Sequence, residues 1–282
     1  MKIKDEQLQV LLTYKCERLS TNAENKKLIQ GFKSQRGKSL VNYLKKKAWQ
    51  EDSNGELAFY IIKNADGKPC LFFSLKCGAM YEPFDEKGIQ EYVEAVQKIK
   101  DGIQKPEDIV SKALELEIQP AELYFILTSI FPRKMKKMSL KKKDEKDDAN
   151  ESIVRVNRNL PGIELVHFCS DDVEKEKWDK DAMQHSMGET LFWFYIVPKI
   201  EETLKLVGCQ YVFLFAADST IDGSLMNYYD VTLKFSSEKK YGTSKPVYDF
   251  GCFFMHQKVE ELLANRDAFF EAFNEDDSEI II

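Results

Sequence analysis

The chain has 282 residues, 43% of them apolar, and its 41 basic and 47 acidic side chains give a formal net charge of −6. This length and apolar content are enough for one large α/β domain or two small ones, and they exclude a disordered chain. The acidic balance excludes a general attraction to nucleic acid or to an anionic membrane, so such a partner needs a local basic patch.

The N-terminal segment and the cysteines bear on the cellular compartment. Residues 1–20 have no uninterrupted apolar run, and no window approaches the roughly 18 apolar residues of a membrane span. The six cysteines are scattered without a C-x-x-C spacing, and the three histidines lie far apart in sequence. We therefore expect a cytoplasmic protein with buried free thiols, no membrane partner and no metal centre.

The first third of the chain reads as a helix and a hairpin. After a charged helical lead-in, residues 39–51 have apolar side chains at helical spacing, and Ser39 is a suitable N-cap. Two β-rich runs, 57–63 and 70–77, follow. An Asp-Gly turn joins them, which predicts an antiparallel hairpin.

The middle of the chain has a different composition. Residues 85–132 have helical periodicity, and residues 132–152 are first basic and then acidic with few apolar side chains. Such a stretch cannot offset its ordering entropy by burial, so we interpret it as a mobile linker. Its lysines, Lys136 to Lys143, are an alternative local site for RNA phosphate or an acidic protein. We expect an N-terminal segment of residues 1–83, a helical insertion and linker at 84–160, and a C-terminal segment of residues 161–282.

Strands and helices alternate after the linker. A strand is expected at 162–170, and a charged loop leads from it to a long helix at 189–207 that Pro198 interrupts. The remaining elements are a strand at 209–215, a short helix with Asp222 as N-cap, a strand at 246–257 and a C-terminal helix. This order predicts an α/β domain with a mixed sheet.

The start of the long helix carries one glycine, Gly188. Unpaired N–H groups and the helix dipole favour anions at such a position, and glycine lets an anion approach the backbone closely. One glycine at a helix start is more often only part of a helix cap. In addition, the Glu189 carboxylate in the first turn would repel a phosphate if it faced the phosphate. The local pattern alone therefore favours a structural role.

The order of the elements resembles the GNAT superfamily of N-acetyltransferases. The resemblance rests on "IELVHFCSDD", "HSMGET", "LFWFYIVPKIEETLKLVG", "CQYVFLFAAD" and "DGSLMNYYDVTLKF", which look like a strand, a phosphate-binding loop, a helix, a second strand and a tyrosine-bearing helix. Upstream, residues 30–80 look like the first helix and hairpin of the branch that includes toxin-type members. The resemblance implies a mixed, mostly antiparallel central sheet flanked by helices, with acetyl-CoA as co-substrate.

The resemblance also implies which residues meet acetyl-CoA, between strands that end near Ser170 and near Ala217. In the loop motif His185 stands where the family has Gln or Arg, and Thr190 stands where it has Gly or Ala. The closing Gly-Phe of the tyrosine helix is replaced by Lys234 and Phe235, one residue further on. The candidate cofactor-binding residues are Phe168, Cys169, Ser170, His185, Met187, Gly188, Glu189, Thr190 and Asp222.

Three side chains are catalytic candidates on this resemblance. Tyr229, or its neighbour Tyr228, would protonate the departing thiolate, and backbone N–H groups on a strand splayed from its neighbour would stabilise the oxyanion. Glu164 would be the general base. Strand alternation gives Glu164 and His167 opposite faces, and His167 is interpreted as a packed strand histidine. Cys169 could carry a covalent acyl group, but a buried, inert thiol is the commoner case.

We expect direct transfer of an acetyl group from acetyl-CoA to an amine that the sequence does not identify. One alternative is a toxin that acetylates aminoacyl-tRNA; the acidic balance argues against nucleic acid, whereas the lysine run offers a local site. The other is a non-catalytic interaction module in which the helical segment 84–132 docks a protein. Acetyl-CoA binding and the salt dependence of tRNA binding separate these alternatives.

Overall fold

The computed structural model describes residues 2–83, 156–217, 223–238, 241–244 and 251–275. The chain forms two compact units, 1–81 with 159–282 and 82–158, and the described elements belong to the first apart from the tips of two strands. The predicted helical insertion, including segment 84–132, and the lysine run at 136–143 lie outside the described residues. The fold below is that of the first unit.

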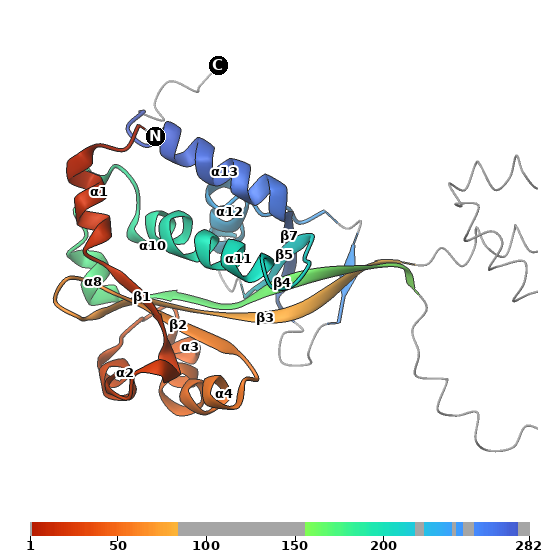
Figure 1. The fold of residues 1–282 in the computed structure, drawn as a ribbon, viewed down its shortest axis with the longest axis horizontal. Helices are drawn as coiled ribbons and strands as arrows, with labels where there is room; N and C mark the ends of the chain where they lie inside the picture. Colours follow the sequence, from red (N-terminus) through yellow and green to blue (C-terminus); the bar gives the residue numbers. More distant parts are fainter. Residues whose placement is uncertain (1, 84–155, 218–222, 239–240, 245–250, 276–282) are drawn as a thin grey trace, which may run out of the picture. The chain divides into compact units, whose positions relative to one another are not determined.

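A single mixed sheet organises this unit (Figure 1). Its strand order is β1-β2-β3-β4-β5-β7, and the short β6 pairs with β3. β1 with β2, β2 with β3, β3 with β6 and β5 with β7 are antiparallel, whereas β4 and β5 are parallel. The mixed, mostly antiparallel sheet flanked by helices is therefore confirmed. The strands are β1 (Lys15–Arg18), β2 (Ala58–Lys63), β3 (Pro69–Pro83), β4 (Val156–Ser170), β5 (Tyr211–Ala216), β6 (Gly242–Thr243) and β7 (Phe253–Lys258).

The predicted hairpin is confirmed as β2 and β3. Its turn closes with a hydrogen bond of 3.0 Å from the Asn64 N–H to the Lys68 carbonyl. Gly67 has φ 74°, a left-handed conformation that glycine adopts without steric cost. The glycine of the predicted Asp-Gly turn is therefore at the position where the backbone is left-handed.

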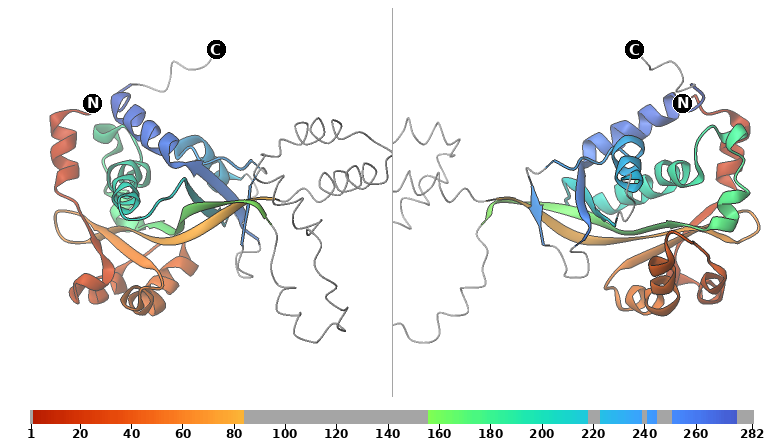
Figure 2. Two further views of the ribbon diagram at one scale, coloured as in Figure 1. Left: turned by 45° about the vertical axis from the view of Figure 1, so that its right-hand side comes forward. Right: turned by 180° about the vertical axis from the view of Figure 1, so that it is seen from behind.

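Helices cover both faces of the sheet (Figures 1 and 2). On one face Phe32, Leu44, Phe59 and Phe72 are buried beneath the N-terminal helices. On the other face a larger apolar core that includes Phe73, Leu191 and Phe192 lies beneath the C-terminal helices. The first layer holds α2 (Glu24–Leu28), α3 (Lys38–Tyr43), the π-turn Leu44–Ala48 and α4 (Trp49–Asn54), and the second holds α1 (Asp5–Leu12), α10 (Met187–Leu191), α11 (Val197–Leu204), α12 (Ser224–Asn227) and α13 (Val259–Glu271).

Several predicted boundaries are corrected. α3 begins at Lys38 with Gly37 as N-cap, so Ser39 is inside the helix. The segment expected to be a charged loop contains α8 (Asp172–Glu176) and α9 (Lys180–Met183), because the side chains of Asp171 and Asp179 accept hydrogen bonds from the first helical N–H groups. The edge strand β1 was not predicted, since its four residues, KCER, carry no β-rich pattern.

The long helix of the second layer runs through Pro198 without stopping. A π-turn, Phe192–Ile196, separates α10 from α11, and Pro198 stands at the start of α11. A proline cannot donate to the carbonyl four residues earlier, and the wider π-turn spacing accommodates that missing bond. The predicted interruption is thus a local change of helix type, and the helix ends at Leu204.

The tyrosine-bearing helix also contains a π-turn. α12 begins after Gly223 and continues into the π-turn Tyr228–Thr232. A π-turn takes up one residue more than an α-helical turn, and Phe235 comes one residue later than the family spacing implies. Lys234 has φ 61°, the left-handed region that favours glycine. Asp222, predicted as the N-cap, lies outside the described residues.

The cysteines are only in some cases as predicted. Cys70 and Cys169 are buried free thiols, whereas Cys77 is exposed and the remaining three are partly buried. Exposure of Cys77 follows from its place on β3 beyond the helices that cover the hairpin. Among the described residues, no helix combines the length and the apolar character needed to cross a membrane.

Candidate functional site

The two parallel strands β4 and β5 separate after a short paired stretch. Their register pairs Gly162 with Tyr211, Ile163 with Val212, and Glu164 with Phe213. Beyond that point β4 continues to Ser170, while β5 remains paired with β7 up to Ala216. We call this divergence, residues 165–170 of β4 and 214–216 of β5, the β4–β5 fork. In the fork, the register of β4 with β5 contains no pair beyond Glu164 and Phe213 among the described residues.

The alternation of side chains along β4 changes within the fork. Leu165 belongs to the core beneath the C-terminal helices, but His167 stacks on Phe59 and contacts Tyr43 on the opposite face, with ring centroids 5.1 and 4.8 Å apart. Leu165 and His167 are two positions apart and would share a face in a regular strand, so β4 has an irregularity between them. The prediction that Glu164 and His167 have opposite faces is therefore wrong.

Glu164 lies where the fork begins. Its partner in the register, Phe213, faces away from the core of Val212 and Leu214, and registered neighbours in parallel strands share a face. Glu164 is half-buried. The carboxylate therefore lies on the sheet face that also bears His167, at the point where β4 and β5 separate.

The start of the long helix lies against the end of β4. A Cβ built on Gly188 would be 3.1 Å from the Tyr228 hydroxyl oxygen, 3.4 Å from Ser170 Oγ and 3.8 Å from Phe168 Cζ. Ser186 caps the helix by accepting a hydrogen bond of 3.3 Å from the Glu189 N–H. The structure thus brings together Phe168, Ser170, Gly188 and Tyr228, four of the residues that the sequence singled out.

The two tyrosines have different surroundings. The Tyr228 hydroxyl is hydrogen-bonded to the Ser186 side chain, and burial, with Tyr229 and Glu189 adding to it, raises the pKa of Tyr228. Burial likewise raises the pKa of Tyr229, which is only 9% exposed and packs edge-on against Phe235. Both phenols are therefore protonated at neutral pH, the form that a general acid requires.

Other residues of the loop motif turn toward the protein. The His185 ring lies between Phe269 and Phe273, at 4.6 and 4.9 Å, and its Nδ1 is 3.4 Å from a Glu189 carboxylate oxygen. Met187 and Thr190 are fully buried, and the Thr190 N–H and hydroxyl both donate to the Ser186 carbonyl. A phosphate at this helix start would therefore meet the backbone N–H groups of Met187 and Gly188 rather than these side chains.

Cys169 lies on the other face of β4. A Cβ built on Gly37 would be only 2.7 Å from its Sγ, so the segment before α3 is pressed onto this thiol. Burial raises the pKa of Cys169 to about 11, which leaves it as a thiol at neutral pH. The prediction that Cys169 is a buried thiol is confirmed, and a contribution to the site would come from its backbone.

The loop before α3 and the residues after β4 were not identified from the sequence. Asp171 and Asp172 bind this loop through its backbone N–H groups at Lys33 and Gln35. Arg36 in the same loop lies 3.5 Å from the Ser224 hydroxyl at the start of α12. The pair of aspartates directly after a predicted strand was the available signal, because such residues often cap a following helix.

Comparison with known proteins gives matches among solved structures only. No protein-family model and no curated protein sequence matches the chain. A crystal structure of a KacT mutant is similar at a TM-score of 0.47 and 12% identity, covering 89% of this chain and 98% of that one. A mutant of the toxin AtaT, bound to the C-terminus of the antitoxin AtaR and to acetyl-CoA, is similar at a TM-score of 0.47 and 10% sequence identity. The match covers 90% of this chain and 98% of that one.

A third similar structure is AtaT complexed with acetyl-methionyl-tRNAfMet, at a TM-score of 0.40 and 11% identity, covering 89% of this chain and 98% of that one. The identities and scores of all three are low. The chemistry of the site therefore rests on this chain's own residues.

Proposed function

We propose that the chain is an acyl-CoA-dependent N-acyltransferase that binds the thioester in the β4–β5 fork and transfers the acetyl group to an amine. The observation that carries the proposal is the fork itself. Among the described residues, pairing of β4 with β5 ends at Glu164, and β4 then continues to Ser170 beside a helix start and a protonated tyrosine. The sequence resemblance to GNAT proteins supports the same assignment.

The backbone of the fork suits the pantetheine and pyrophosphate groups of the co-substrate. An extended strand edge can pair with the two amides of pantetheine as it would with another strand. Gly188 has no side chain of its own, and helix N–H groups attract phosphate oxygens. Ser170 Oγ and the Tyr228 hydroxyl flank that position.

The reaction needs one base and one acid. Glu164 would accept a proton from the ammonium form of the acceptor, directly or through a water molecule, and the neutral amine would attack the thioester carbonyl carbon. Backbone N–H groups of β4 would hold the resulting oxyanion. As the intermediate collapses, the C–S bond breaks and the thiolate takes a proton from a tyrosine hydroxyl. The attacking nitrogen loses its extra proton, which restores the phenol, and the products are the amide and free CoA.

The position of its hydroxyl favours Tyr228 as that acid. This hydroxyl lies beside Gly188 and Ser170 at the end of β4, whereas Tyr229 packs against Phe235. The resemblance to GNAT proteins names Tyr229 first, so both residues enter the test. Each phenylalanine variant removes one oxygen and keeps the ring.

The first experiment is titration calorimetry of the wild-type protein with acetyl-CoA, followed by an assay for CoA release with a panel of amines. The panel includes polyamines, lysine peptides and aminoacyl-tRNA, because the upstream segment resembles the toxin branch. We expect Tyr228→Phe to bind acetyl-CoA normally and to lose about 100-fold or more in kcat, the usual contribution of a positioned acid.

Three results would decide between assignments. Loss of turnover in Tyr229→Phe but not in Tyr228→Phe would give the acid role to Tyr229. Glu164→Gln should lower kcat/KM most at low pH, where the acceptor is charged and needs a base. If the wild type binds no acyl-CoA, the enzyme proposal fails and a non-catalytic interaction module is the better description.

A further inference from the structure

A groove of about 520 Å³ lies on the outer side of the loop that precedes α3. Phe32 and Val41 form its apolar floor, and Lys33, Lys38 and Lys45 line one wall. The opposite wall is α8. The groove-lining residues include none of the residues proposed for acyl transfer, so it is a separate feature of the molecule.

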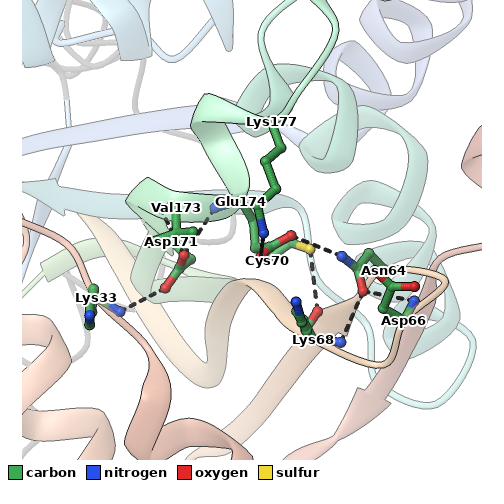
Figure 3. Close-up of polar contacts among 9 residues, drawn as sticks. All are labelled: Lys33, Asn64, Asp66, Lys68, Cys70, Asp171, Val173, Glu174 and Lys177. Carbon is green, nitrogen blue, oxygen red and sulfur yellow. Dashed lines mark hydrogen bonds and ion pairs between the residues drawn. The ribbon is translucent and has the colours of Figure 1, made fainter.

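Two carboxylates, of which Asp171 is buried and Asp172 is partly exposed, join α8 to the loop before α3. Asp171 is 4% exposed; one of its oxygens accepts the Lys33 N–H at 2.7 Å and the other accepts the Val173 N–H at 2.9 Å, as Figure 3 shows. Asp172 adds a bond of 2.6 Å from the Gln35 N–H. The groove is thus built from fixed backbone on both sides, which lowers the entropy lost when a ligand binds.

α8 is also fixed on its far side. In Figure 3 the Glu174 carboxylate accepts one bond from Asn64 in the β2–β3 turn, at 2.9 Å, and another from Lys177, at 2.7 Å. The Asn64 bond therefore joins α8 to the β2–β3 turn, whereas the Lys177 bond is local to the end of α8.

The chain segment that supplies the groove lysines is basic, whereas α8 supplies Asp172 and Glu176 to the lining. Residues 26–50 contain eight basic side chains and no acidic one, in a chain whose formal net charge is −6. Asp172 on the opposite wall already binds the Gln35 N–H, which leaves Glu176 as the exposed carboxylate among the lining residues. The three groove lysines are therefore suited to an anion.

The spacing of the lysines indicates more than one anionic group. Lys38 and Lys45 are seven residues apart, two turns along one helix face, which is about 10 Å at the helical rise. The exposed Lys33 extends the cationic wall beyond the start of α3. A single small anion cannot contact both ends of such a wall.

We propose that this groove binds a nucleoside that carries two or more phosphates. The phosphates would contact Lys38 and Lys45, and the base would lie over the apolar floor of Phe32 and Val41. The groove volume is within the usual range of small-ligand sites, roughly 300–1,000 Å³, and lysine is a common phosphate ligand. The proposal does not depend on acyl transfer, because binding is measured directly.

The test is calorimetry of the full chain with adenosine 3′,5′-bisphosphate, ADP and inorganic pyrophosphate. Lys38→Gln and Lys45→Gln should each weaken nucleotide binding about fivefold, since an exposed ion pair contributes up to about that factor. The matched control is Lys46→Gln, which removes the same charge from the neighbouring residue outside the groove lining and should leave affinity unchanged. Glu176→Gln should tighten binding.

Several outcomes would overturn the proposal. One is that no nucleotide binds at millimolar concentration, and another is that pyrophosphate binds as tightly as ADP. A third is that the groove variants and the Lys46 control lose the same amount of nucleotide affinity. Binding of RNA oligonucleotides alone, with steep salt dependence, would instead identify a general polyanion surface. CoA is tested separately. If the groove variants weaken the binding of both CoA and ADP, the groove holds the nucleotide moiety of CoA. If they weaken only the binding of ADP, the ligand is a free nucleotide.

Discussion

Protonation of His167 should destabilise the fold, and the size of the effect follows from its surroundings. The ring is 7% exposed, contacts the rings of Tyr43 and Phe59, and its Nδ1 is hydrogen-bonded to the Ser74 hydroxyl at 2.7 Å. Burial lowers the pKa of His167 from 6.5 to about 4. The charged form is therefore disfavoured in the folded state.

The sign and the magnitude can be worked out from this shift. Between pH 6.5 and 4 the unfolded chain binds a proton that the folded chain does not, so the free energy of unfolding falls as the pH falls through this window. The loss is about 2 kcal/mol at pH 5 and approaches about 3 kcal/mol below pH 4, at about 1.4 kcal/mol per pKa unit. Above pH 6.5 His167 contributes no pH dependence.

The measurement is urea unfolding of the wild type and His167→Gln at several pH values from about 7.5 to about 5. Glutamine has no proton to gain and can still accept a hydrogen bond from Ser74. Burial also lowers the pKa of His256, with the same sign, but that contribution is common to both proteins and cancels in the difference. A wild-type pH slope equal to that of His167→Gln would refute the assigned environment.

Three further predictions concern stability, each measured by urea unfolding. Lys234→Gly should stabilise the protein by about 1 kcal/mol, because Lys234 has φ 61°, and Lys234→Ala should give no such gain. Asp171→Asn should lower the free energy of unfolding by about 2–4 kcal/mol, since it disturbs both the α8 cap and the bond to the Lys33 N–H. A similar loss in Asp172→Asn, at a more exposed residue, would argue against this reason. Gly37→Ala should lower the free energy of unfolding by about 1–3 kcal/mol, because the added methyl group meets the Cys169 sulfur. The loss should be smaller in a protein that also carries Cys169→Ala. An equal loss in that protein would exclude the contact as the cause.

Local patterns were enough to predict much of the fold. Turn residues between two β-rich runs identified the hairpin, and helical periodicity identified the long helix at whose start Gly188 lies. The short strand β1 and the helix α8 were missed because their four and five residues carry no periodic apolar pattern, and pairing and capping by distant residues define them. The divergence of β4 from β5 was expected only from the resemblance to GNAT proteins.

The composition of the candidate site was only partly accessible. Sequence reasoning placed Ser170, Gly188 and Tyr228 in one site, and the structure brings them into contact. The sequence analysis gave His185 and Thr190 a role in binding the cofactor. In the structure, the His185 ring packs against Phe269 of α13 and against Phe273 beyond its end, and the Thr190 hydroxyl donates to a backbone carbonyl. Whether a side chain faces a ligand or the core depends on packing partners that are distant in sequence.

The sequence by itself determined the mixed sheet, the helix start with its glycine, and a basic segment in an acidic chain, because periodicity, turn chemistry and charge are local properties. Only the tertiary structure decided that an irregularity in β4 puts Glu164 and His167 on one face, since regular alternation predicts the opposite. It also decided that Gly188 makes room for the Tyr228 hydroxyl and that Asp171 joins α8 to a lysine-lined loop. These contacts join residues 40 to about 140 positions apart, and no local pattern encodes them.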